Sequence, residues 1–175
     1  LWEGEYIVQN ILKHINPFNR RKLKQFLKEN NEATSTFIFA LPQKSGYALF
    51  GLEYISLETK KGYSLFNPNA NCEIRPINIV RMDKNYLIER GGGNLQLQYK
   101  KVAIIGCGSV GGYIVEGLSK SGVLNLCLID NDKLMPENIY RHILGRNYIG
   151  QAKVNALKHE MNNKLPHNNI STHSL

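Results

Sequence analysis

A glycine-rich motif at residues 106–111 has the composition of a phosphate-binding turn. It reads Gly-Cys-Gly-Ser-Val-Gly and lies between an apolar run and a segment with helical spacing, which predicts a strand, a tight turn and a helix. Gly106 permits the turn, Gly108 lets a phosphate approach the backbone, and Gly111 allows the helix to pack closely on the strand. The helix start at Ser109 presents unpaired N–H groups and the positive end of its dipole to phosphate oxygens. The motif therefore predicts a nucleotide site.

An acidic residue, Asp130, ends the next predicted strand. It follows the glycine motif by about 20 residues, the spacing at which a carboxylate accepts hydrogen bonds from the ribose hydroxyls of a nucleotide. Strand, turn, helix and acidic residue together favour nucleotide binding. The alternative is a glycine-rich turn that serves packing alone.

Two cations come after this acidic residue and indicate more than cofactor binding. Arg141 lies in an irregular segment and Lys153 lies near a helix start. The pyrophosphate of a dinucleotide does not need both, whereas phosphoryl or nucleotidyl transfer does, because charge builds up on the phosphate oxygens and on the departing pyrophosphate. Asn138 can donate to the same oxygens. The alternative is that Arg141 forms a surface ion pair and that Lys153 is solvated.

The elements that must position these residues alternate between strand and helix. Apolar runs and helical spacing predict a β-α-β-α-β series with strands at 102–105 and 124–129 and near Ile170, and helices at 109–121 and 152–163. Such a series is the start of a doubly wound parallel sheet. We therefore expect an α/β fold, in which residues 95–175 form the N-terminal half of a Rossmann-like domain.

Residues 1–94 have a different pattern, which predicts a small α+β domain. Apolar and basic positions alternate at helical spacing over 5–30, with a break at Pro17. Three runs rich in β-formers follow, then a short helical stretch and a glycine-rich segment. The expected elements are strands at 36–41, 47–52 and 77–80, a helix at 81–90 and a hinge at 91–94.

Composition and charge exclude several classes of protein. The chain has 175 residues, a net charge of +8 and 42% hydrophobic residues, with no apolar run long enough to span a membrane. Basic residues are spread along it without aromatic interleaving, so we expect neither nucleic acid nor membrane as a partner. Three cysteines without metal-like spacing favour a cytoplasmic location, and Cys107 and Cys127 read as small buried hydrophobic residues.

The order of these motifs resembles that of the ThiF/MoeB/ubiquitin-activating superfamily. The resemblance covers residues 100–175, and the Asn-Ile-Tyr-Arg-His variant is most similar to bacterial members, in which the adenylation domain follows a conjugating-enzyme-like domain and a linker domain. Residues 1–94 would then be mostly the linker part. The motifs that carry the resemblance are the glycine motif, Asp130-x-Asp132, Asn138-x-x-Arg141 and Ile149-Gly150-Gln-x-Lys153.

The resemblance implies a reaction: the C-terminal carboxylate of a ubiquitin-like or sulfur-carrier protein attacks the α-phosphate of ATP, giving an acyl adenylate and pyrophosphate. The glycines and Ser109 would hold the nucleotide, and Asp130 and Asp132 its ribose. Arg141 and Lys153 would stabilise the transferring phosphate, assisted by Asn138.

Further implications concern residues outside these motifs. Either Arg81 or Arg90 would supply another arginine, across the interface of a homodimer. His142 would be structural rather than a base, because the attacking carboxylate is already ionised at neutral pH.

Magnesium is the second cofactor that the resemblance implies. The family places its magnesium-binding aspartate after further strands, beyond Leu175, so no metal ligand is expected in this chain. The sequence also begins at Leu1 without a methionine and stops as a new segment opens, which suggests a piece of a longer polypeptide. We therefore expect these 175 residues to be catalytically inactive by themselves.

Two other functions fit part of the pattern. An NAD(P)-dependent Rossmann oxidoreductase would use the glycine motif and Asp130, but it has no use for Arg141 and Lys153. A non-catalytic scaffold would use the fold to bind a ubiquitin-like partner, and it too has no need of these two cations.

Overall fold

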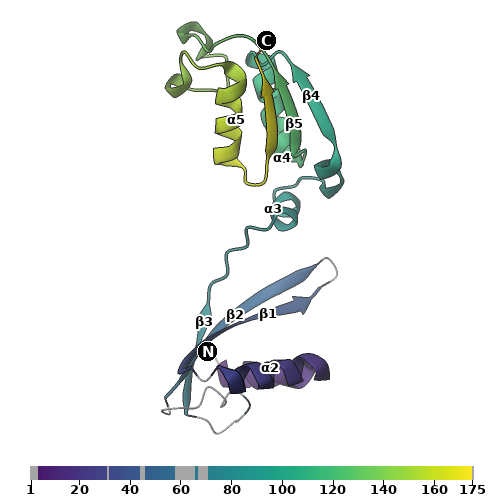
Figure 1. The fold of residues 1–175 in the computed structure, drawn as a ribbon, viewed down its shortest axis with the longest axis vertical. Coiled ribbons are helices and arrows are strands. Elements are labelled where there is room, and N and C mark those ends of the chain that lie inside the picture. The colour runs from purple at the N-terminus through teal and green to yellow at the C-terminus, as the bar shows by residue number, and fades with distance from the viewer. Residues whose placement is uncertain (1–3, 31, 44–45, 58–65, 67–70, 175) are drawn as a thin grey trace. The chain divides into compact units, whose positions relative to one another are not determined.

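The computed structural model describes residues 4–30, 32–43, 46–57, 66 and 71–174. The chain divides into two compact units, Leu1–Val80 and Arg81–Leu175 (Figure 1). Within the described part, no helix has both the length and the apolar composition needed to cross a bilayer.

The first unit combines two helices with an antiparallel sheet. Helices α1 (Gly4–His14) and α2 (Pro17–Glu29) precede strands β1 (Thr34–Pro42), β2 (Tyr47–Ser56) and β3 (Cys72–Ile77), which pair in the order β1-β2-β3. The side chains buried between helices and sheet are Val8, Leu12, Leu27, Phe37, Leu52 and Tyr54.

The break between the two helices was predicted at Pro17, and the structure confirms it. Pro17 occupies the first turn of α2, where a proline loses no intrahelical hydrogen bond. Asn16 caps this helix, because its side-chain oxygen accepts a hydrogen bond of 2.8 Å from the amide of Phe18. The Asn16-Pro17 pair therefore separates the two helices and begins the second one.

The predicted strand at 77–80 is wrong, because β3 lies earlier, at Cys72–Ile77. Pro76 argues against a strand in the sequence, but β3 is an edge strand, where a missing amide donor is tolerated. Beyond the strand, Ile79 covers the sheet: a Cβ on Gly51 would lie 3.0 Å from Ile79 Cδ1. Ile79 therefore packs on the sheet instead of extending it, whereas Val80 is exposed.

The second unit contains the predicted β-α-β-α-β series. Strands β4 (Lys101–Ile105), β5 (Asn125–Ile129) and β6 (Asn169–His173) are parallel and lie in the order β4-β5-β6. They are connected through helices α4 (Ser109–Ser121) and α5 (Lys153–Lys164), and η2 (Leu95–Tyr99) precedes β4. The predicted α/β fold is confirmed.

Both long helices of this unit pack on one face of the sheet. Val115 of α4 and Leu157 of α5 are fully buried in one cluster with Ile104, Leu128 and Ile170. Ile104 lies opposite Leu128 in the sheet, and Ile170 lies opposite Leu126, two residues from Leu128, so the three side chains point to the same face. Burial of these side chains is the main stabilising contribution that the helices add to the sheet.

The glycine segment at 91–94 is packed, so the prediction of a hinge there is wrong. The amide of Asn94 donates to the Ser121 carbonyl at 2.9 Å, and a Cβ on Gly93 would lie 3.0 Å from that same oxygen. Glycine is thus required for close packing against the end of α4. Helix α3 (Lys84–Arg90), which starts after its cap Asp83 rather than at residue 81, belongs to the same unit.

The division between the units therefore differs from the predicted domain boundary. It falls between Val80 and Arg81 rather than after Asn94. The role of residues 1–94 as an accessory or linker domain stays a prediction.

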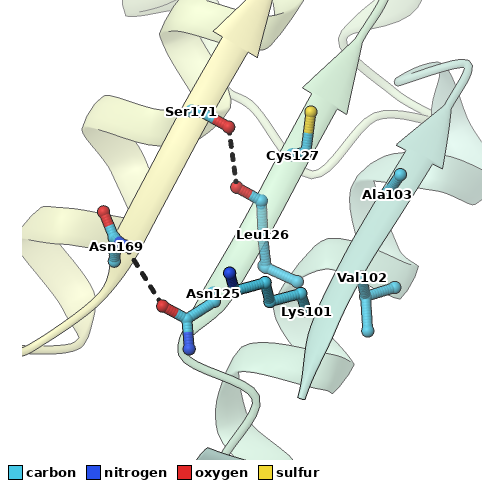
Figure 2. Close-up of a pocket in the computed structure, with 8 residues that line it drawn as sticks. All are labelled: Lys101, Val102, Ala103, Asn125, Leu126, Cys127, Asn169 and Ser171. Carbon is cyan, nitrogen blue, oxygen red and sulfur yellow. Dashed lines mark hydrogen bonds between the residues drawn. The ribbon is translucent and has the colours of Figure 1, made fainter. Parts of the chain in front are cut away.

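A cavity of about 300 Å³ opens at the amino ends of the parallel strands (Figure 2). Its lining includes Lys101, Asn125 and Asn169, the first residues of the three strands, and Asn169 Nδ2 donates to Asn125 Oδ1 at 3.1 Å. Nucleotides bind outside the carboxyl ends of the strands in open α/β sheets. This cavity therefore lies at the wrong end of the sheet for the glycine motif.

Replacing Gly111 with Ala tests how closely α4 approaches β4. A Cβ at this position would lie 1.9 Å from the Gly106 carbonyl oxygen, so we expect a loss of about 3 kcal/mol in unfolding free energy. Urea denaturation followed by circular dichroism measures it. Gly108→Ala is the matched control: no described atom lies within 4 Å of the added carbon, and the expected loss is below about 1 kcal/mol. Equal losses in the two variants would contradict the packing argument.

Candidate nucleotide site

The glycine turn leaves open space at the start of α4. Gly106 adopts φ +89°, a conformation that favours glycine, and its amide donates to the Ile129 carbonyl at 2.9 Å, joining the ends of β4 and β5. Gly108 is the N-cap of α4, receives no side-chain cap from the described residues, and has no described atom within 4 Å of where its Cβ would lie. The amides that follow are those that an α-helix leaves unpaired. A phosphate can approach them closely.

Asp130 is fixed to this turn by two backbone amides. Its Oδ2 accepts a hydrogen bond of 2.6 Å from Cys107 N, and its Oδ1 accepts one of 2.7 Å from Asp132 N. Each carboxylate oxygen keeps a lone pair for another donor. The residue predicted to accept from ribose hydroxyls is therefore held beside the turn, with acceptor capacity left.

Lys153 is almost buried and points to the same end of the sheet. Its side chain is 10% exposed, and its Nζ lies 2.8 Å from Oδ2 of Asp132, whose side chain is 66% exposed. The Lys153 amide also donates to the Asp132 carbonyl at 2.9 Å. The alternative of a simply solvated lysine is therefore excluded. Because an ammonium has three donors, this contact leaves two for an anion.

Asn138 and Arg141 lie in the segment between β5 and α5, which contains two short turns, η3 (Pro136–Asn138) and η4 (Arg146–Tyr148). The Oδ1 of Asn138 accepts from Met135 N at 2.9 Å, and its carbonyl accepts from Arg141 N at 3.0 Å. Its side-chain NH₂ group has no hydrogen bond to a described residue. Arg141 is exposed and forms no ion pair within the part of the chain that the structure describes. Both groups are available to a ligand.

His142 joins this segment to the glycine turn. Its ring is 6% exposed, its Nδ1 accepts from Leu144 N at 3.1 Å, and its Nε2 lies 2.9 Å from the Cys107 carbonyl. Since Nδ1 accepts, Nε2 carries the proton and donates. A Cβ on Gly112 would lie 3.3 Å from the His142 ring, so a glycine at this position leaves room for the ring. In the sequence, the Gly111-Gly112 pair is the feature that corresponds to this contact.

Arg81 and Arg90 differ in their surroundings. The guanidinium of Arg81 contacts both carboxylate oxygens of Asp83, at 2.8 and 3.0 Å, and lies 4.2 Å from the centroid of the Tyr86 ring. Arg90 is exposed in the last turn of α3 and has no ion pair with a described residue. Of the two, Arg90 is the one free to meet a phosphate.

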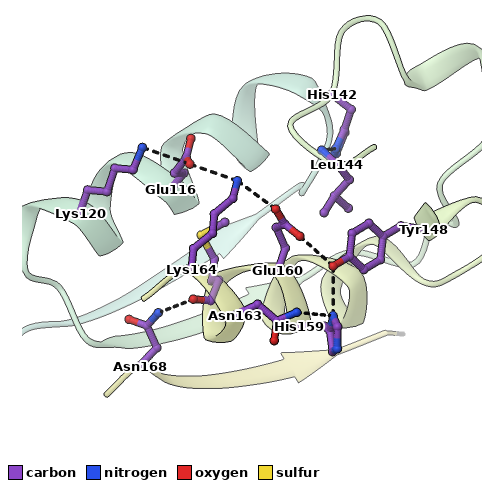
Figure 3. A network of polar contacts seen from close by, with 11 residues as sticks. Glu116, Lys120, His142, Leu144, Tyr148, His159, Glu160, Asn163, Lys164 and Asn168 are labelled. Carbon is purple, nitrogen blue, oxygen red and sulfur yellow. Dashed lines mark hydrogen bonds and ion pairs between the residues drawn. The ribbon is translucent and has the colours of Figure 1, made fainter. Parts of the chain in front are cut away.

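A polar network that the sequence did not indicate connects the segment of Arg141 to both long helices (Figure 3). The Tyr148 hydroxyl donates to Glu160 Oε2 at 2.7 Å, and Glu160 Oε1 lies 3.0 Å from Lys164 Nζ. Lys164 reaches Glu116 of α4 at 3.4 Å. Hydrogen bonds from Tyr148 and Lys164 hold the pKa of Glu160 below its usual value, whereas burial and Glu160 raise the pKa of Tyr148. At neutral pH the carboxylate is ionised and the phenol is protonated.

Both carboxylates of this site already have partners within the chain. Both oxygens of Asp130 accept amide hydrogen bonds, and Asp132 faces the cation of Lys153. Among the described residues, no three side chains of His, Cys, Asp or Glu come together as a metal site.

The second unit matches a known protein family. The model of the ThiF family covers residues 83–174, which is more than half of the chain. The matched range includes the glycine turn, the two aspartates and the segment with Arg141 and Lys153.

Individual proteins similar to the chain are longer than it is. The ATP-dependent ubiquitin transferase-like protein Cap2 of Pseudomonas aeruginosa (strain BWHPSA011 / Pa011) is 29% identical over 161 residues, which are 87% of this chain and 30% of that protein. Adenylyltransferase and sulfurtransferase MOCS3 of Xenopus laevis is 33% identical over 88 residues, 49% of this chain and 19% of that protein. The chain thus spans less than a third of either relative.

Among solved structures, a crystal structure of E. coli MccB with ATP is 27% identical in sequence, with a TM-score of 0.44. The match covers 51% of this chain and 26% of that chain.

The reactivity of Cys107 tests how tightly the turn is closed. Its side chain is fully buried, and burial, followed by the charge of Asp130, raises the pKa of its thiol from 9.0 to about 11. At pH 8 we expect iodoacetamide to modify the half-buried Cys72 and Cys127 first, and Cys107 only after denaturation, as read by mass spectrometry. As pH rises, the Cys107 thiol deprotonates in the unfolded chain before it does so in the folded protein. The raised pKa of this thiol therefore lowers the free energy of unfolding above pH 9.0. Equal modification of the three thiols in the folded protein would contradict the closed turn.

Proposed function

The chain belongs to the ThiF family, and on that premise we propose that it binds ATP for an adenylyltransferase that activates the C-terminal carboxylate of a ubiquitin-like or sulfur-carrier protein. The observation that carries the proposal is the open space at Gly108, beside a fixed Asp130 and an almost buried Lys153. This combination provides an anion site, a ribose acceptor and a cation at one end of a parallel sheet.

In this proposal the glycine turn holds the phosphates of ATP. The amides at Ser109 and Gly111 donate to phosphate oxygens, and the positive end of α4 adds to the attraction. Asp130 accepts from the ribose hydroxyls through the lone pairs that the backbone amides leave free. Asp132 holds Lys153 in place and lies at the edge of the ribose site.

Arg141, Lys153 and Asn138 stabilise the phosphate under attack. The carboxylate of the acceptor forms a bond to the α-phosphorus, and the bond from that phosphorus to the pyrophosphate breaks. Negative charge moves onto the pyrophosphate, and the two cations and the free amide donors of Asn138 lower the energy of that charge. The acceptor is ionised at neutral pH, so no base is needed, and His142 keeps its structural contacts.

The names of the relatives support this choice of reaction. Cap2 is described as an ATP-dependent ubiquitin transferase-like protein, and MOCS3 as an adenylyltransferase and sulfurtransferase. We extend ATP-dependent activation of a ubiquitin-like partner from these proteins to the polypeptide of which this chain would be a part.

We further propose Arg90 as the additional arginine, acting in a homodimer. It is exposed in the last turn of α3, whereas Arg81 already contacts Asp83 and Tyr86. Because the described residues contain no cluster of three metal-ligating side chains, we assign ATP binding to this chain and expect turnover only where another segment supplies a magnesium ligand.

Binding of ATP to the purified chain tests the proposal. Arg141→Ala removes a cation from the phosphates, and we expect it to weaken ATP binding about tenfold, measured by isothermal titration calorimetry. Gly108→Ala, which leaves the fold intact, should weaken binding to a similar degree because its methyl group fills the phosphate space.

Arg146→Ala is the control for this experiment. Arg146 is exposed in the same segment and has no ion pair with a described residue, so its loss should leave the ATP affinity unchanged. Binding of NAD⁺ in preference to ATP would favour an oxidoreductase. Absence of nucleotide binding would favour a scaffold, and both results contradict the proposal.

A further inference from the structure

The segment that carries Arg141 has little regular structure to fix it. Between Met135 and Gly150 it contains only two short 3₁₀ turns. The ends of this segment are tied together, since Gly150 N donates to Leu134 O at 2.8 Å and Lys133 bridges Ala152. A catalytic cation on such a segment needs side-chain contacts that hold its backbone in position.

The segment has two buried or half-buried anchors, and both follow Arg141 in the sequence. His142, the next residue, is held through the Cys107 carbonyl. Tyr148 lies further along the segment: its ring is half-buried against the core of the second unit and lies edge-on to His159, with ring centroids 5.9 Å apart. Its hydroxyl donates to Glu160 at 2.7 Å and lies 3.0 Å from Nδ1 of His159.

The hydrogen bond from Tyr148 to Glu160 is part of a series of polar contacts that reaches α4 (Figure 3). Glu160 pairs with Lys164 at 3.0 Å on α5, and Lys164 pairs with Glu116 at 3.4 Å on α4. Helix α4 starts at the glycine turn. A single hydroxyl therefore joins the Arg141 segment to the two helices that support the phosphate-binding turn and Lys153.

We propose that Tyr148 is a positioning residue for Arg141, acting through its hydrogen bond to Glu160 to place the Arg141 segment against bound ATP. This inference rests on the function proposed above. The guanidinium of Arg141 has no ion pair with a described residue, so its position follows from that of its backbone. Tyr148 itself is bonded to Glu160 and His159 and is not assigned a contact with the nucleotide.

A double-mutant cycle on the purified chain tests this role. Tyr148→Phe keeps the ring and its packing and removes only the hydroxyl, and we expect ATP to bind about fivefold more weakly. In an Arg141→Ala background, the same substitution should change the ATP affinity by less than about twofold, because the group that it positions is gone. Thermal melting of each variant separates this effect from a loss of stability.

Tyr140→Phe is the matched control. Tyr140 lies in the same segment, its side chain is fully exposed, and it has no hydrogen bond to a described residue, so removing its hydroxyl should leave ATP affinity unchanged. If Tyr148→Phe does not fold, Glu160→Gln replaces it in the cycle, because the amide keeps the shape of the side chain and removes the charge that Tyr148 and Lys164 contact.

The outcomes separate failure of this inference from failure of the proposed function. Equal effects of Tyr148→Phe with and without Arg141, or no effect at all, overturn the positioning role and leave the ATP site standing. If Arg141→Ala alone does not weaken ATP binding, both the assignment of Arg141 and the role of Tyr148 are overturned.

Discussion

The amino end of α4 lies so close to the end of β4 that only glycine fits at position 111. The Gly106 carbonyl oxygen would be 1.9 Å from a Cβ there. This approach is what allows the chain to leave β4, reverse over a few residues and enter α4 with its first amides directed away from the core. Strand β5, Asp130 and the segment of Arg141 depend on that turn, because each of them is hydrogen-bonded to its backbone.

Three contacts converge on the backbone of the turn. Gly106 N donates to Ile129 O, Cys107 N donates to Asp130, and Cys107 O accepts from His142. The turn therefore fixes β5, the ribose-binding candidate and the segment of Arg141 at once. All three contacts use residues 106 and 107 and leave Gly108 and the amides after it open. The polar groups that hold the site are thus separate from those that we assign to ATP, which is the arrangement that a preorganised anion site requires.

Local sequence patterns predicted the strands and helices around the site, but not the contacts between them. The apolar run ending at Ile105 and the helical spacing over 109–121 marked β4 and α4, because both signals lie in neighbouring residues. The contacts of His142 and Tyr148 join residues that are not neighbours in the sequence, and the periodicity of apolar residues does not indicate such contacts. The hinge prediction at 91–94 failed for the same reason, since Gly93 serves packing against Ser121, which only the folded chain brings near. The position of β3 could not be predicted either, because Pro76 is tolerated only in an edge strand and the order of the strands is not visible in the sequence.

In the proposed complex, ATP binds at the start of α4. The most direct measurement is an NMR titration of the ¹⁵N-labelled chain with ATP, in which each amide reports on its own surroundings. We expect the largest shifts at Ser109, Gly111 and Lys153, together with the amides that bond to Asp130. Shifts confined to the cavity at Lys101, Asn125 and Asn169, or shifts spread evenly over the sheet, would contradict it.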